Sequence, residues 1–190
     1  MDSELVLGLI NNCKLSKQTL YSEANKSDWG NLGKRGGFDY KPPYGWIGIG
    51  LDVLNKYDEG NNDWLSKDGN KNEWAVAYAN ASQRTINHIL TSGFRIGNGQ
   101  AYANYDDIYH PGHKVGRGVY CSPNAEIMET YANFNREKME INGKKYILGL
   151  MLRVNPKKIR CPSENKQFWV LNPGDDEIRP YRILIKEIIE

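Results

Sequence analysis

The alternation of apolar and polar positions along the chain predicts many short strands separated by turns rich in glycine and asparagine. Bounding glycines and prolines give each apolar run a length typical of a strand. The runs with this pattern cover residues 44–54, 73–79, 116–122, 145–154, 167–171 and 181–189. Glycines interleaved with the apolar residues of the first run indicate a strand with close neighbours.

Helical spacing of apolar residues occurs in three places. Residues 3–24 carry two short apolar stripes, which predict a helix that packs against the rest of the protein. Ser82 is suited to cap a second helix, and Gly93 is suited to end it. Asn124 is suited to cap a third helix after Pro123. One face of this third helix would carry Ile127, Met128 and Tyr131.

Strand patterns outnumber helix patterns, so the predicted fold class is α+β. Residues 27–43 and 94–113 read as loops, and the second is long enough to indicate a functional role. Residues 58–72 read as a polar turn region anchored by apolar side chains. We therefore expect an N-terminal helix and a loop rich in glycine and aromatic residues at 1–43, packing on a domain at 44–190.

Composition favours a folded protein with no broad charged surface. Aromatic residues make up 11% of the 190 residues and charged residues 25%. The formal net charge of +2 comes from 25 basic and 23 acidic residues that are well interspersed, so we expect neither nucleic acid nor membrane as a partner. No apolar run has the length of a membrane span.

Three cysteines, Cys13, Cys121 and Cys161, form no disulfide framework or zinc pattern, which favours a reducing compartment. The first residues lack the basic start and the apolar region of a secretory signal. A cytoplasmic location, with a cytoskeletal one as a variant, follows by elimination.

The stretch from Lys114 to Asn133 holds the most informative pattern. Gly116 and Gly118 remove side chains where another group can approach the backbone closely. Tyr120 on the predicted strand and Tyr131 on the predicted helix are eleven positions apart. A strand followed by a helical turn can direct both rings into one cleft, where they would enclose a flat ring. The competing interpretation is that both are half-buried core tyrosines.

These motifs carry a resemblance to a known family. Residues 116–122, Gly-Arg-Gly-Val-Tyr-Cys-Ser, the later Tyr131 and the late strand at 167–171 resemble the catalytic domain of poly(ADP-ribose) polymerases, a branch of the ADP-ribosyltransferase superfamily. The likeness covers residues 74–190, and residues 44–65 and 177–185 look like a branch found in microbial eukaryotes. The resemblance implies split antiparallel β-sheets with a few short helices, and NAD as the donor substrate.

The resemblance also implies a site that has lost catalytic groups. Ala79 and Asn80 stand where the family has a His-Gly pair, and Met128 stands where many members have a serine. Gln167 replaces the family's glutamate. The implied cofactor-binding positions are Ala79, Asn80, Gly118, Tyr120, Ser122, Met128 and Tyr131, and the implied, degenerate catalytic positions are Tyr120 and Gln167.

Three functions follow from the resemblance. The first is a catalytically impaired protein with this fold, whose NAD binding is weakened or lost and which serves as a binding or structural module for an unknown protein partner. The second is an active, NAD-dependent mono-ADP-ribosyltransferase that modifies a protein or a nucleic acid. In the third, the fold persists only as packing, with the cleft filled by its own aromatic residues.

Other chemistry is weaker. His110 and His113 have a spacing that zinc tolerates, but no clear third ligand accompanies them, so no metal site is predicted. Cys121 is better read as a small buried hydrophobic residue than as a nucleophile. The basic pairs at 144–145 and 157–158 are typical of solvated faces. Arg153 and Arg160 are expected to pair with Asp175, Asp176 or Glu177.

Overall fold

The computed structural model of the chain describes residues 15–20, 33–134 and 138–189. Within these residues the longer strands are β4 (Ile47–Leu51), β5 (Ala75–Asn80), β8 (Lys144–Val154) and β10 (Ile178–Ile188), together with β1 (Leu15–Leu20). Short strands are β2 (Lys34–Arg35), β3 (Phe38–Asp39), β6 (Val119–Cys121), β7 (Met139–Ile141) and β9 (Trp169–Leu171). The helices are α2 (Gln83–Ser92) and α3 (Ala125–Phe134), with 3₁₀ turns η2 (Asp58–Gly60) and η3 (Asp63–Leu65).

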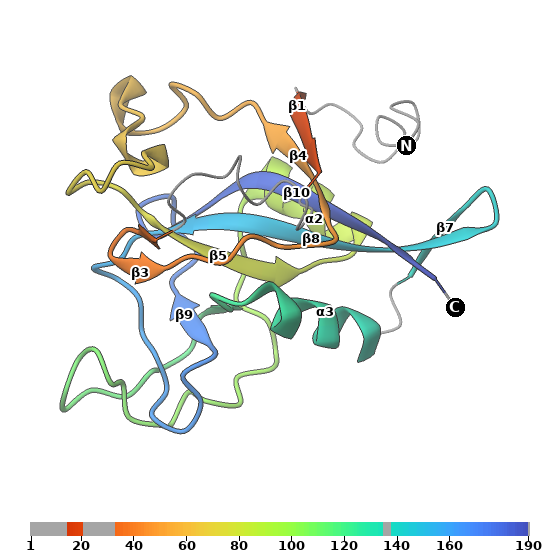
Figure 1. The fold of residues 1–190 in the computed structure, drawn as a ribbon. Coiled ribbons are helices and arrows are strands. Elements are labelled where there is room, and N and C mark those ends of the chain that lie inside the picture. Colours follow the sequence, from red (N-terminus) through yellow and green to blue (C-terminus); the bar gives the residue numbers. More distant parts are fainter. Residues whose placement is uncertain (1–14, 21–32, 135–137, 190) are drawn as a thin grey trace.

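The described part of the chain is built on one large antiparallel sheet in the order β1-β4-β10-β8-β5, with β7 paired to β8 (Figure 1). The long strands β8 and β10 pair along almost their whole length and form its centre. A two-stranded sheet, β6 with β9, lies apart from it, as does the small β2–β3 hairpin. The arrangement is α+β, as the sequence predicts.

The large sheet and the β6–β9 pair are joined at Tyr78 and Ser122. The Tyr78 N–H donates to the Ser122 carbonyl at 2.7 Å, and the Ser122 N–H donates back at 2.9 Å. This bridge brings the end of β5 beside the end of β6 and the start of α3.

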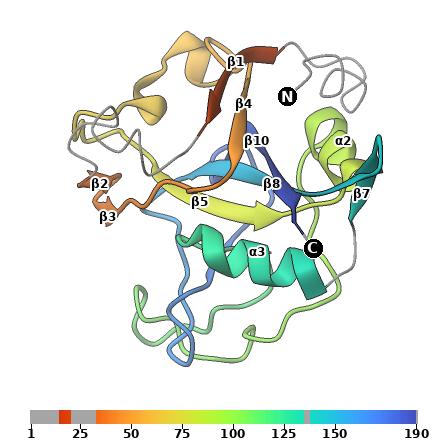
Figure 2. The same ribbon diagram turned by 45° about the vertical axis from the view of Figure 1, so that its right-hand side comes forward.

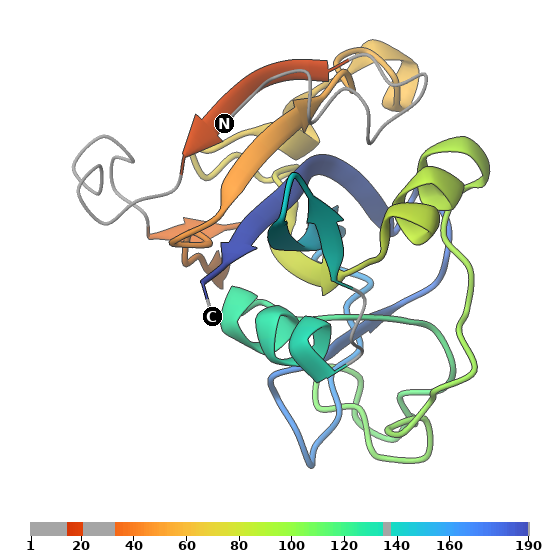
Figure 3. The same ribbon diagram turned by 90° about the vertical axis from the view of Figure 1, so that its right-hand side faces the viewer.

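The two helices lie on opposite sides of the large sheet (Figures 1 and 3). The Ser82 hydroxyl caps α2 by accepting from the Thr85 N–H at 3.1 Å, as the sequence predicts. Asn124 Oδ1 caps α3 by accepting from the Glu126 N–H at 3.0 Å. Lys186 of β10 donates to both carboxylate oxygens of Glu129 at 2.7 Å and so ties α3 to the sheet. Figure 2 shows α3 alongside β5.

Each helix covers its own buried apolar cluster. The larger cluster includes Ile86 of α2 and the β8 residues Leu148, Leu150 and Leu152. The smaller one includes Met128 of α3 with residues from the opposite face of the sheet. Gly149 of β8 lies directly under Met128, whose sulfur occupies the space that a β-carbon would take.

A buried charged cluster stabilises one end of the sheet. Glu73 lies 3.9 Å from Arg153 Nη1 and 4.0 Å from Arg35 Nε. Arg153 also donates to the carbonyls of Trp74, Leu65 and Ser66. Arg153 therefore pairs with Glu73 and not, as the sequence suggested, with the acidic turn at 175–177.

The β2–β3 hairpin packs its turn against the edge of β5. Gly36 has a φ of +57°, and a β-carbon there would collide with the backbone of Trp74 and Ala75. The turn therefore reaches the β5 edge because residue 36 has no side chain.

The predicted strands at 44–54, 73–79, 145–154 and 181–189 correspond to β4, β5, β8 and β10. The helix predicted at 3–24 is wrong at residues 15–20, which form β1, and its remaining residues lie outside the described part. Backbone pairing of β1 with the exposed edge of β4 outweighs the weak apolar stripe of this segment. Neither helix of the described residues has the length and apolar character needed to cross a membrane.

Candidate functional site

An aromatic cavity of about 250 Å³ lies where β5, β6 and α3 meet the long loop before β6. Its walls come from five segments of the chain. The lining residues are Tyr78, Ala79, Asn80, Gly99, Ala101, Tyr102, Tyr120, Cys121, Ser122, Ile127, Met128, Tyr131 and Phe168. The Tyr78–Ser122 bridge holds the first wall against the second, and the cap at Asn124 starts α3 at the right place to supply the third.

Phe168 is the central ring of the cavity. Its ring stacks on Tyr102 with centroids 5.4 Å apart and meets Tyr131 edge-on at 5.6 Å. It also contacts Tyr120 at 6.5 Å. Tyr131 is 45% exposed and so lies at the rim. Tyr120 and Tyr131 therefore line the same cavity, and the Phe168 ring packs against both.

Hydrogen bonds tie the long loop to β6. The Tyr120 hydroxyl accepts from the Tyr102 N–H at 3.0 Å. The Gln100 side chain accepts from the Gly118 N–H at 2.9 Å and donates to the Gly118 carbonyl at 3.0 Å. Asn165 donates to the Tyr102 hydroxyl at 3.0 Å. These bonds hold the loop wall of the cavity in place.

The glycines of the Gly-Arg-Gly motif make room for neighbouring protein groups. A β-carbon on Gly118 would lie 2.6 Å from the Leu171 carbonyl oxygen and 2.8 Å from Arg160 Nη2. Gly116 has a φ of +71°, and a β-carbon there would lie 3.2 Å from Arg160 Nη1. The close approach predicted from these glycines is thus made by β9 and by the Arg160 guanidinium.

The cavity is neutral. The described residues that line it include no charged side chain. Burial raises the pKa of the Cys121 thiol far above its usual value, so this lining residue stays uncharged. The Ser122 hydroxyl accepts from the Asn124 N–H at 3.1 Å. Asn80 contributes a carboxamide to the lining, and the Tyr120 hydroxyl, which accepts from the Tyr102 N–H, can also donate one hydrogen bond.

Six of the predicted site residues come together here: Ala79, Asn80, Tyr120, Ser122, Met128 and Tyr131. Gly118 and Gln167 are not part of the lining. Gln167 is exposed just before β9, with its N–H donating to Asn165 Oδ1 at 3.1 Å. Phe168, its neighbour, lines the cavity instead, since Gln167 lies in a turn closed by the Phe168 N–H, which donates to the Asn165 carbonyl at 3.2 Å.

Sequence reasoning did not assign Phe168 or Ile127 to the site. Phe168 was visible only as one apolar residue of a strand pattern, and its position depends on where the turn at 165–168 ends and β9 begins. The sequence contains only a weak indication for Tyr102, which was an aromatic residue in a long loop with no motif to place it at the cavity.

His110 and His113 do not line the aromatic cavity. His110 Nδ1 lies 2.7 Å from the Asp107 carboxylate. Burial alone would raise the pKa of Asp107, but hydrogen bonds from the Cys161 N–H, His110 and the Tyr109 N–H lower it below its usual value of 3.8. No group of three or more potential ligands for a metal ion occurs among the residues that the structure describes.

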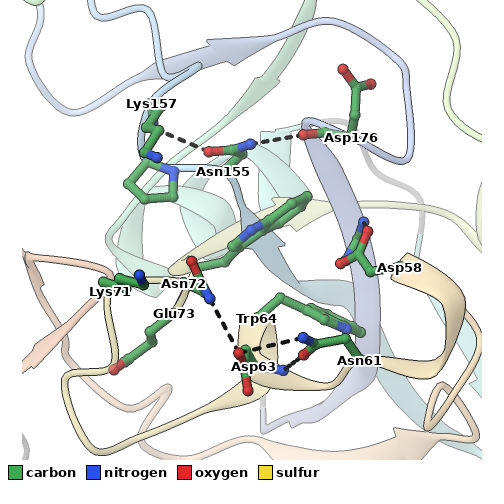
Figure 4. A pocket seen from close by; sticks show the side chains of 13 residues that line it. Asp58, Asn61, Asp63, Trp64, Lys71, Asn72, Glu73, Asn155, Lys157 and Asp176 are labelled. Carbon is green, nitrogen blue, oxygen red and sulfur yellow. Dashed lines mark hydrogen bonds and ion pairs between the residues drawn. The ribbon is translucent and has the colours of Figure 1, made fainter.

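A second cavity, of about 360 Å³, is polar and lies over η3 and the start of β5 (Figure 4). Its polar side chains bind one another: Asp63 Oδ2 accepts from Asn72 at 3.2 Å and from Asn61 at 3.4 Å. Arg179 pairs with both oxygens of Asp58 at 2.7 Å and lies over the Trp74 ring at 4.1 Å. These contacts give this cavity a structural role in joining β10 to the 58–74 segment.

Comparison with known proteins assigns the chain to no family. The scan against protein-family models gave no match, and the search of curated proteins found no similar sequence.

Proposed function

We propose that the aromatic cavity is a retained binding site for a flat, neutral ring of the nicotinamide type. In this proposal the chain is a divergent, PARP-like protein of the ADP-ribosyltransferase fold that has lost efficient catalysis. It acts as a binding module in a larger assembly, through a protein partner that is still to be identified.

One observation carries the proposal. Tyr120 and Tyr131, the two positions that match the ring-enclosing tyrosines of the family, line the same cavity although they come from different elements. Phe168 adds a third ring between them. Aromatic side chains that line a cavity can hold a planar ring by stacking.

The size and charge of the cavity favour a small ligand. Drug-sized ligands occupy pockets of roughly 300–1,000 Å³, and this cavity has about 250 Å³. A single ring with a carboxamide fits this volume, and the Asn80 amide and the Tyr120 hydroxyl can exchange hydrogen bonds with that carboxamide. The described lining offers no cation to hold the pyrophosphate of a whole dinucleotide.

The same lining argues against efficient catalysis. Loss of nicotinamide from NAD passes through an oxocarbenium-like transition state, which a nearby carboxylate stabilises. The described lining has no carboxylate, and Gln167, which stands at the family's glutamate position, is exposed outside it. Ala79 and Asn80 form the wall where the family has histidine and glycine.

Calorimetric titration with nicotinamide and with NAD tests the proposal. We expect saturable nicotinamide binding that Tyr131→Ala weakens roughly fivefold or more, because stacking by one aromatic ring contributes about 1 kcal/mol beyond its buried area. Tyr109→Ala is the matched control: Tyr109 is 43% exposed, against 45% for Tyr131, and does not line the cavity. Absence of binding by the folded protein would reject the proposal.

The second candidate is an active mono-ADP-ribosyltransferase, which the convergence of Tyr120 and Tyr131 also supports. If this candidate is correct, the protein releases nicotinamide from NAD, and the substitution Tyr120→Ala abolishes this release. The double variant Ala79→His/Asn80→Gly restores the family's pair and serves as the positive control. No nicotinamide release by the original protein at high concentration would reject this candidate and leave the binding module.

A further inference from the structure

A basic pocket of about 400 Å³ lies on the turn after β8, between residues 107–114 and the segment that leads into β10. It shares no lining residue with the aromatic cavity. The lining residues are Asp107, His110, His113, Lys114, Lys157, Lys158, Arg160, Asn172 and Glu177. Four of these are permanently cationic, two are imidazoles and two are carboxylates.

Both carboxylates of the basic pocket are already bound within the protein. Asp107 is 3% exposed and accepts from the Cys161 N–H, the Tyr109 N–H and His110. Glu177 is 6% exposed and accepts from the Asn172 N–H at 2.6 Å and from its side-chain amide at 2.9 Å. The negative charge of both carboxylates is therefore stabilised by donors of the protein itself.

One cation, Lys114, is paired with Asp106 Oδ1 at 2.6 Å, but the other three are not neutralised in this way. Lys157 and Lys158 have no carboxylate partner among the described residues. The Arg160 guanidinium donates to the carbonyls of Val115 and Arg117 and to Asn172 Oδ1, all of which are uncharged. Three cations without a carboxylate partner in the described part of the chain thus stand beside two lining carboxylates that are bound internally, which leaves a small excess of positive charge at this pocket.

The frame of the basic pocket is fixed by backbone and side-chain bonds. Asn155 Oδ1 accepts from the Lys157 N–H at 3.1 Å, and its amide donates to the Asp176 carbonyl at 3.0 Å, which joins the two turns (Figure 4). Arg160 is held in the space left by the glycines at 116 and 118. Arg160 and the backbone that carries Lys157 are therefore held in place, while the side chains of Lys157 and Lys158 are exposed and can reach a ligand.

We propose that the basic pocket binds a phosphomonoester dianion, either free or carried on a polypeptide side chain. Ammonium and guanidinium groups form charge-assisted hydrogen bonds with phosphate oxygens, and a compact group of them suits a single phosphate. A nucleic acid would need an extended basic track, but acidic residues adjoin this pocket: Asp106 binds Lys114, and Asp176 lines the neighbouring polar cavity together with Lys157. This proposal does not depend on the function of the aromatic cavity.

Titration of the full chain with three probes tests the proposal: inorganic phosphate, a phosphoserine peptide and the same peptide without phosphate. We expect the phosphopeptide or inorganic phosphate to bind, and Lys157→Gln/Lys158→Gln to weaken binding roughly ten- to hundredfold, the range for hydrogen bonds to charged groups. Lys158→Gln should give part of this loss. Lys41→Gln, which removes one exposed charge elsewhere, should change nothing.

The three probes and a single-stranded oligonucleotide separate the sources of the phosphate. Phosphopeptide binding well above that of inorganic phosphate supports a polypeptide source, and equal binding supports a free phosphomonoester. Equal binding of the unphosphorylated peptide, tighter binding of the oligonucleotide, or unchanged affinity in the double lysine variant would each overturn the proposal.

Discussion

The hydroxyl of Tyr120 accepts a 3.0 Å hydrogen bond from the backbone N–H of Tyr102 and so fastens the long loop to β6. The tyrosine that resembles a ring-binding residue of a transferase thus also positions a wall of its own cavity. Effects of Tyr120 variants on ligand binding must therefore be separated from their effects on the loop.

Tyr120→Phe keeps the ring and removes this acceptor. We expect the free energy of unfolding to fall by about 1 kcal/mol, because the partly buried Tyr102 N–H loses its partner. Amide hydrogen exchange at Tyr102 should become faster. Tyr105→Phe, which changes a 40% exposed tyrosine of the same loop, is the control and should leave both measurements as they were. Unchanged exchange at Tyr102 would show that the bond does not restrain the loop.

Gly118→Ala should destabilise the protein by about 1–3 kcal/mol, the usual cost of overpacking. The added β-carbon would lie 2.6 Å from both the Leu171 oxygen and Val170 Cγ1, and these belong to a buried strand that cannot move away freely. Chemical denaturation measures the effect. Gly97→Ala, where no atom lies within 4 Å of the new carbon, should cost much less; equal losses would contradict the packing argument.

Arg153→Met should lower the free energy of unfolding by about 3–5 kcal/mol, as expected when one partner of a buried ion pair is removed. The substitution leaves Glu73 with Arg35 at 4.0 Å and removes a donor from three carbonyls. Thermal or urea denaturation provides the measurement. Arg95→Met removes an exposed arginine and should be nearly neutral. A loss below about 1 kcal/mol in the first variant would show that the cluster is not needed.

Acid should destabilise the protein in part through Asp107. Its pKa in the folded protein lies below the usual 3.8, so its stabilising contribution is present above that value and is lost as the pH falls through the lower, folded pKa. Asp107→Asn should therefore reduce stability at neutral pH and flatten the decline in stability below about pH 4. Asp106→Asn, at the exposed neighbouring position, should keep the decline of the original protein. Denaturation curves from pH 2 to pH 7 compare the three.

The sequence allowed the main strands and both caps to be predicted, because their signals are local. Ser82, Gly93 and Asn124 act on backbone groups a few residues away, so the pattern around them suffices. The strand β1 was missed because its state depends on pairing with β4, more than 25 residues later, and a short apolar stripe does not report that partner.

Site residues could be predicted where a sequence motif fixed their spacing. They could not be predicted where their position depends on how distant segments pack. Tyr120 lies on a strand and Tyr131 on the helix that follows it. Their spacing of eleven residues therefore sufficed to predict that both side chains line one cavity. Whether Gln167 or Phe168 enters the cavity depends on where the turn at 165–168 ends and β9 begins, and the sequence pattern extended that strand two residues too far. Likewise, Gly116 and Gly118 indicated a close approach, but only the fold identifies Arg160 and β9 as the neighbours.

The contact between Gly36 and the edge of β5 affects how copies of the protein meet. An uncovered edge strand presents N–H and C=O groups that can pair with another chain and start aggregation. The hairpin turn lies over this edge near Ala75, and the bridge to Ser122 occupies it at Tyr78. A side chain at residue 36 would push the turn away and expose a template for intermolecular pairing, so this glycine protects the colloidal stability of the protein as well as its packing.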